Sequence, residues 1–204
     1  MNNHNNKSAI GLAVLFELIL IVTALVDILS REWKTVLLVL LAMVCLILPF
    51  IITWIANLKN IMLPSSFQII TLIFIVLAQY FGEIMNFYQI FWWWDLFLHA
   101  IFGSYGVIIA WHLMRGVIRK EQETTNQRFT LFRSIVAFSF TIASGALWEI
   151  LEFMGDYFFK TSMVKGGLED TSTDLIVKIL AAFITSTFCY YRILKRNNSL
   201  RLEI

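Results

Sequence analysis

The sequence predicts an all-α membrane protein: a bundle of six transmembrane helices that form one domain, residues 1–204. Of the 204 residues, 59% are hydrophobic and only 15% are charged, whereas about a quarter of the residues of a soluble domain are charged. The apolar residues gather in stretches that reach the length of about 20 residues that a membrane-spanning helix needs. The residues outside these stretches are too few for a second domain.

Six stretches meet this length, and each is expected to be one transmembrane helix. They cover about residues 9–29, 34–56, 66–88, 94–114, 131–157 and 172–192. The first is too long for a typical signal-peptide core and lacks a clear small-residue cleavage site, so we interpret it as a retained span. Pro49 is expected to kink the second span. Cys45 and Cys189 both fall inside spans, which favours packing roles over a disulfide or a thiolate metal site.

The distribution of Lys and Arg predicts the orientation. One side of the expected topology carries eleven basic residues: Lys7, Lys59, Arg115, Arg119, Lys120, Arg128, Arg133, Arg192, Lys195, Arg196 and Arg201. The other side carries four: Arg31, Lys34, Lys160 and Lys165. Since the basic side of a membrane protein faces the cytoplasm, both termini are expected there, in a bacterial cytoplasmic membrane. The basic span ends suit lipid headgroups as partners, and no separate signal for nucleic acid is present.

Aromatic residues precede the fourth span in an unbroken run, 91–94, of Phe followed by three Trp. Indole rings favour the membrane–water interface, so the run is expected to mark the outer surface. A row of stacked rings that binds a sugar or a base is the alternative.

Eight ionisable residues occupy the outer half of the expected bundle. They are Glu83, Asp95, His99, Glu149, Glu152, Asp156, Asp170 and Asp174. A charge in the hydrocarbon is costly, so such residues usually face a cavity, a partner or a bound ion. Seven of the chain's 14 acidic residues lie in this one layer, which predicts a common site.

The spacing of these residues supports one pocket. Asp95 and His99 are four residues apart, and the acidic residues of 149–156 are separated by three and four, so each set shares a helix face. The sixth span carries Asp170, Asp174 and Lys178 at steps of four. Small residues extend two of these faces, at Gly103, Gly106 and Gly145, and would let neighbouring helices approach closely. Three spans therefore offer polar stripes that can converge.

So many carboxylates cannot all stay ionised in a low dielectric without compensation. An ion pair between Asp174 and Lys178, one helical turn apart, is the simplest partial compensation. A bound divalent cation is a further one, and ligands that are mostly oxygens favour Mg²⁺, Mn²⁺ or Ca²⁺. The candidate metal ligands are Asp95, Glu149, Glu152 and Asp174. Glu83, Asp156, Asp170 and Lys178 are expected elsewhere in the pocket.

The C-terminal 110 residues, approximately, resemble the YjdF-like family of bacterial inner-membrane proteins, a family with no established activity. The resemblance rests on Trp94-Asp95-x-x-x-His99, on Trp148-Glu149-Ile150-x-Glu152-Phe153-x-x-Asp156, and on Gly167-Leu168-x-Asp170-Thr171-x-x-Asp174. More distantly, the order of Asp-x-x-x-His, Glu-x-x-Glu and Asp is similar to VanZ-like proteins, which are associated with glycopeptide antibiotic tolerance. Lys178 departs from the Asn expected there.

The favoured functional hypothesis is metal-assisted chemistry on a lipid or cell-envelope precursor in the outer leaflet. His99 is the candidate general base or a fifth ligand, because imidazole changes protonation near neutral pH, and Glu152 is the second candidate catalytic residue. A secondary transporter coupled to protons or cations is the alternative, since intramembrane acids with Lys and His also form proton relays. A non-catalytic accessory protein, whose polar residues only fix helix packing, is the third possibility.

Overall fold

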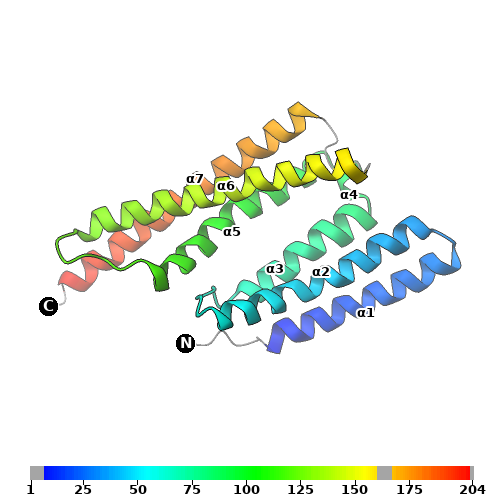
Figure 1. Ribbon diagram of the computed structural model, residues 1–204, viewed down its shortest axis with the longest axis horizontal. Coiled ribbons are helices and arrows are strands. Elements are labelled where there is room, and N and C mark those ends of the chain that lie inside the picture. The colour runs from blue at the N-terminus through cyan, green and yellow to red at the C-terminus, as the bar shows by residue number, and fades with distance from the viewer. Residues whose placement is uncertain (1–6, 160–166, 203–204) are drawn as a thin grey trace. The chain divides into compact units, whose positions relative to one another are not determined.

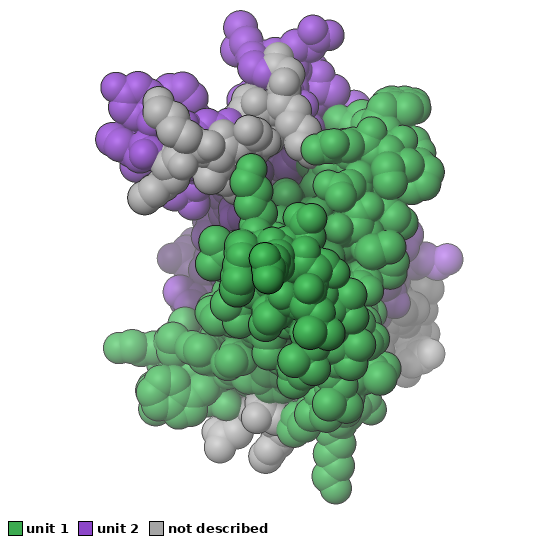
Figure 2. Space-filling view, turned by 90° about the vertical axis from the view of Figure 1, so that its right-hand side faces the viewer, with its two compact units in different colours: residues 1–98 green, residues 99–204 purple. Residues whose placement is uncertain are grey.

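The computed structural model describes residues 7–159 and 167–202, and all secondary structure in these ranges is helical. Six of the helices are long and apolar enough to cross a membrane, which confirms the predicted fold class. Lys160 and Lys165, two of the basic residues that entered the orientation argument, lie outside the described residues. The chain divides into two compact units, residues 1–98 and 99–204 (Figure 2). The boundary cuts one continuous helix, so the single transmembrane domain stays a prediction.

The first unit contains α1 (Lys7–Leu29), α2 (Trp33–Leu58), α3 (Phe67–Ile75), η1 (Val76–Ile84) and α4 (Phe87–Ile90). Helices α1 and α2 form a hairpin and pack side by side (Figure 1). Arg31 closes the turn between them in a left-handed conformation, with φ of 61°. Small residues on both helices, including Ala9, Ala13 and Ala42, are buried where α1, α2 and α3 meet. Their size lets the helix backbones come close, which is how packing is achieved without a hydrophobic driving force from water.

Pro49 lies inside α2 and is fully buried. The Thr53 hydroxyl, one turn later, donates a 2.7 Å hydrogen bond to the Pro49 carbonyl. Gln68 on α3 donates in turn to the Thr53 hydroxyl at 3.2 Å. A buried amide needs a partner in an apolar medium, so this pair ties α3 to α2.

The sequence predicted one transmembrane helix over residues 66–88, and the third span differs from this prediction. Its second half, η1, is a π-helix, and the span ends at Ile84. Asn86 then takes a left-handed conformation with φ of 57°, which Asn tolerates better than most residues. The chain turns back so that the Tyr88 ring packs on Gly82, where a Cβ atom would lie only 2.3 Å from Tyr88 Cε2. A wide helical turn next to a glycine gives that ring its space.

The residues of the aromatic run 91–94 differ in how far they are buried. Trp92 is 83% exposed, as expected for an interfacial ring, but Trp94 is buried. The Trp94 ring packs edge-on against Phe87 at 5.0 Å between centroids and also contacts Phe81 and Phe97. Trp94 is therefore a packing residue at the start of the next helix. The interfacial position of the run stays a prediction, with which the exposure of Trp92 agrees.

The second unit is built from α5 (Trp94–Val117), α6 (Asn126–Phe159) and α7 (Leu168–Leu202). The first turn of α5 belongs to the first unit and the rest of α5 to the second. Helices α6 and α7 run side by side (Figure 1). Ser186 on α7 donates a 2.9 Å hydrogen bond to the Ser134 carbonyl on α6. An apolar core fills the half of this unit that contains Val107, Ala137 and Ala182, all fully buried.

Candidate functional site

Helix α5 carries the first pair of site residues. Asp95 lies in its first turn and is half-buried, and His99 follows one turn later and is 7% exposed. Because both residues are on one continuous helix, the four-residue spacing puts them on the same face. His99 therefore presents its imidazole beside the Asp95 carboxylate.

Helix α7 supplies the residue that meets them. Asp174 is 3% exposed, and its Oδ2 lies 3.2 Å from His99 Nε2. One ligand atom each from Asp95, His99 and Asp174 can be chosen so that all three lie within 4.8 Å of one another. This group of three, called the Asp–His–Asp triad below, has a spacing at which one metal ion could be held.

Helix α6 brings Glu149 to the same region, but Glu149 is not part of the triad. Lys178 Nζ donates a short hydrogen bond to Glu149 Oε1, and the two side chains form an ion pair. The exposed fractions of these residues are 5% for Glu149 and 1% for Lys178. The expected pair between Asp174 and Lys178 is therefore wrong: Lys178 pairs across the helix interface, and Asp174 pairs with His99. Four buried ionisable side chains thus form two contacts that join all three helices.

Glycines explain how so large a cation is accommodated. A Cβ atom at Gly103 would lie 2.6 Å from the Lys178 carbonyl oxygen, and one at Gly145 would lie 3.1 Å from Lys178 Cδ. The centroid of the Phe102 ring lies 5.9 Å from Lys178 Nζ. Gly103 thus lets α5 lie close to the α7 backbone, the close approach that the sequence predicted, and Gly145 leaves room for the Lys178 stem.

Glu152 lies one turn beyond Glu149 on α6. It is partly exposed and accepts a 2.7 Å hydrogen bond from Trp148 Nε1. The charges of Glu149, His99 and Lys178 are all close enough to act on it. Glu152 is therefore beside the cluster, is more accessible than His99 and Asp174, and is not part of the triad.

Three remaining candidates are not among the residues that form the triad. Asp156 is half-buried near the end of α6, and Asp170 is half-buried in the first turn of α7. Glu83 is exposed on η1, in the first unit. Their membership of the pocket stays a prediction. Trp148 and Phe102, which contact Glu152 and Lys178, were not expected as site residues. In the sequence, aromatic residues at helical spacing cannot be told apart from ordinary core residues, so these two were not predicted.

The chain is thus a multi-pass helical membrane protein with a buried cluster of acids, a histidine and a lysine between three helices. It belongs to the family described as "Predicted membrane protein (DUF2238)", whose model matches residues 11–196. The YjdF-like resemblance fits this family, whereas these comparisons do not support the VanZ-like one.

One relative shows how far the similarity extends. A Thermotoga maritima protein, titled "Uncharacterized protein", is 28% identical over 116 residues, and the alignment covers 57% of this chain and 57% of that protein. The chain therefore matches little more than half of that relative's length. No solved structure matches the chain.

Proposed function

We propose that the Asp–His–Asp triad binds a divalent cation and that the cation assists chemistry on a lipid or cell-envelope precursor. The observation that carries this proposal is the spacing of the three ligand atoms, all within 4.8 Å of one another. Three protein ligands leave coordination positions open for water or substrate, which is the arrangement of catalytic metal sites. A cation held in this way polarises a phosphoryl or acyl oxygen or activates a water molecule.

The ligand set favours Mn²⁺ among the expected Mg²⁺, Mn²⁺ and Ca²⁺. Two carboxylates suit all three cations. An imidazole ligand suits first-row transition metals better than Mg²⁺ or Ca²⁺. Zn²⁺ shares this preference, so it belongs in any binding comparison.

The two candidate catalytic residues receive different roles. His99 offers one of the three ligand atoms that lie within 4.8 Å of one another, which favours a ligand role for its imidazole over the role of general base. Glu152 is partly exposed beside the cluster and is the residue we assign to proton transfer. A general base must come within hydrogen-bond reach of the reacting group, and an accessible carboxylate next to the metal meets that need.

The site is proposed to face the outer leaflet of a bacterial cytoplasmic membrane, with both termini inside. The support is the excess of Lys and Arg on the opposite side. We expect an impermeant maleimide to label Ser30→Cys but not Thr125→Cys in intact cells, in a background in which Cys45 and Cys189 are replaced by Ala. Both positions are exposed, so both should be labelled once the cells are permeabilised. Labelling of position 125 alone in intact cells would reverse the orientation.

A secondary transporter is the second candidate, favoured by the continuous set of buried ionisable groups: His99, Asp174, Glu149 and Lys178. A transport path must continue through the rest of the bundle. In the described part of the second unit, the fully buried residues Val107, Ala137 and Ala182 lie beyond the cluster, together with the buried hydroxyl groups of Thr141 and Ser186, which donate to backbone carbonyls. The buried residues of this region that the structure describes include no further acid or base, which favours chemistry from one side over transport. A purely structural role for the cluster is the third candidate.

One experiment separates the three. The protein is placed in sealed vesicles of bacterial envelope lipids that enclose a pH-sensitive dye, with Mn²⁺ added outside. We expect a change in a phosphate-bearing or acyl-bearing lipid, detected by mass spectrometry, that a chelator stops and that Asp174→Asn lacks, without a change in internal pH. A pH change that disappears in Asp174→Asn would establish the transporter instead. If neither signal occurs, the structural role stands.

A further inference from the structure

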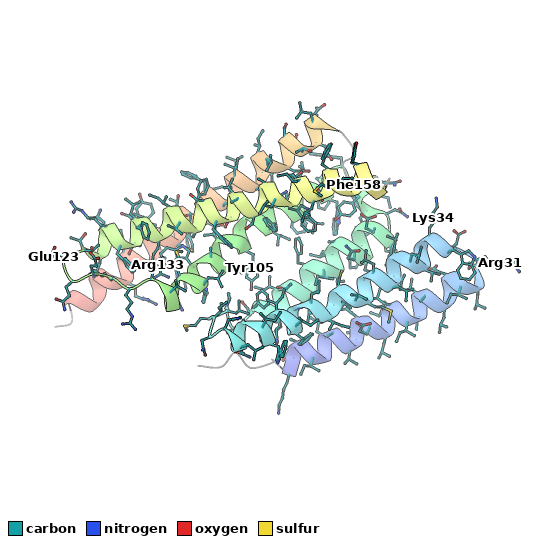
Figure 3. All side chains as sticks on the ribbon, in the orientation of Figure 1. Arg31, Lys34, Tyr105, Glu123, Arg133 and Phe158 are labelled. Atoms are coloured by element: carbon teal, nitrogen blue, oxygen red, sulfur yellow. The ribbon has the colours of Figure 1, made fainter. Side chains whose placement is uncertain are left out.

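Arg133, like Lys178, is a basic residue that lies inside a span, and it is half-buried. It is on α6 (Figure 3), and its Nη2 donates a 2.8 Å hydrogen bond to the Trp111 carbonyl on α5. Its Cζ lies 4.2 Å from the centroid of the Trp111 ring and 5.8 Å from that of Phe129. Stacking on indole and a backbone hydrogen bond fix the plane of the guanidinium. Arg133 is thus a preorganised cation.

This cation has no counter-anion in the described residues. No carboxylate there forms an ion pair with Arg133 or with Arg115, although Glu121 and Glu123 lie in the same connection between α5 and α6. Arg115, in the last turn of α5, is instead close enough to repel Arg133. Two like charges so close together, one of them held in place, attract an anion.

Two hydrogen-bond donors in the same contact are also unmatched. Trp111 Nε1 and Arg133 Nε are both buried, and neither has an acceptor in the described residues. Trp111 as a whole is only 5% exposed. Buried N–H groups are nearly always hydrogen-bonded, so donors without acceptors call for an acceptor that the polypeptide does not supply.

We propose that Arg115, Arg133 and Trp111 form a binding site for the phosphate of an anionic phospholipid. A planar guanidinium matches phosphate oxygens with paired hydrogen bonds. Basic pockets between transmembrane helices at the membrane surface are where lipid headgroups bind. The rings of Trp111 and Phe129 lie 4.2 Å and 5.8 Å from the Arg133 Cζ, so apolar surface borders the cation. This site is separate from the Asp–His–Asp triad and does not rest on the proposed metal chemistry.

The test is a titration of detergent-solubilised protein with dihexanoyl phosphatidylglycerol, followed by native mass spectrometry. Loss of a charge-assisted pair of hydrogen bonds corresponds to about a 10-fold change or more. We therefore expect Arg133→Gln and Arg115→Gln each to weaken binding by about 10-fold, and Arg133→Lys to weaken it less. Arg128→Gln is the matched control, because Arg128 is an exposed basic residue on the same helix and, unlike Arg115, is not among the charges that act on Arg133. It should change binding by less than about twofold.

Several outcomes would overturn the site. Equal weakening by Arg128→Gln would mean diffuse attraction to the basic loop. Equal binding of dihexanoyl phosphatidylcholine would remove the requirement for net negative charge. Binding of inorganic phosphate as tight as that of the lipid would mean a site for free phosphate. Arg115 does not contact Trp111 through any described hydrogen bond, so Arg115→Gln keeps the test valid if Arg133→Gln disturbs the fold.

Discussion

Lys178→Met is expected to lower the free energy of unfolding by about 3–5 kcal/mol, the range found when one partner of a buried ion pair is removed. Methionine has nearly the length of the Lys178 stem, so the space beside Gly145 stays filled. What is lost is the ammonium that binds Glu149. The carboxylate of Glu149 is then left 5% exposed without its cation. Unfolding in mixed detergent micelles, followed by circular dichroism, measures the loss.

A double variant isolates the charge from the packing. Lys178→Met combined with Glu149→Gln leaves no unpaired charge, so most of the lost stability should return. Replacing both members of a buried pair with neutral groups is often close to neutral. Lys34→Met is the matched control, because Lys34 on α2 is exposed, and it should change stability by less than about 0.5 kcal/mol. If the double variant is as unstable as Lys178→Met alone, the loss comes from packing and the ion pair is not the cause.

Helical periodicity predicted which site residues share a face. Asp95 and His99 are four residues apart on α5, and Asp174 and Lys178 are four apart on α7, so each pair had to share one side of its helix. Burial of a charge in an apolar medium then required these faces to meet other polar groups. Both conclusions need only the sequence, because they rest on helix geometry and on the cost of desolvation.

The partner of each charge could not be predicted in the same way. Lys178 can reach along its own helix to Asp174 or across the interface to Glu149, and the sequence spacing favours the first. The choice depends on how α5, α6 and α7 are rotated and on how closely they approach. Gly103 and Gly145 set that approach, because each backbone lies against Lys178. The sequence predicted that the helices come close at these glycines, but not which side chain would use the space.

The π-helix of the third span was missed for a related reason. Residues 76–84 contain no proline, and their apolar pattern fits a regular helix. A hydrogen bond from the Met85 amide to the Tyr80 carbonyl, five residues earlier, closes the last of the wide turns at 2.9 Å. The bulk of Tyr88, folded back on Gly82, lies six residues further along the chain. Local sequence patterns do not report such a contact, because it forms only when the following turn is in place.

Asp174→Asn is expected to weaken Mn²⁺ binding by at least about 100-fold. Loss of a residue that only orients a metal ligand typically costs 10–100-fold in affinity, and Asp174 is assigned here as a direct ligand. Asparagine keeps the shape of the side chain and one oxygen, so the fold should be preserved while the negative charge is lost. Titration of the protein in lipid nanodiscs, followed by the electron paramagnetic resonance signal of free Mn²⁺, measures the affinity directly.

Two further variants decide whether the triad, and not the acidic cluster as a whole, binds the cation. Glu149→Gln should leave the affinity within about 10-fold of the wild type, because Glu149 is engaged by Lys178 and acts at most from outside the ligand set. Glu169→Gln, an exposed carboxylate in the first turn of α7, should have no measurable effect. Mn²⁺ should also raise the unfolding temperature of the wild type, since a ligand that binds only the folded state stabilises it by mass action. If Asp174→Asn and Glu149→Gln lower the Mn²⁺ affinity equally, the cation is held by the total charge of the cluster. In that case the 4.8 Å spacing of Asp95, His99 and Asp174 would have no special role in binding.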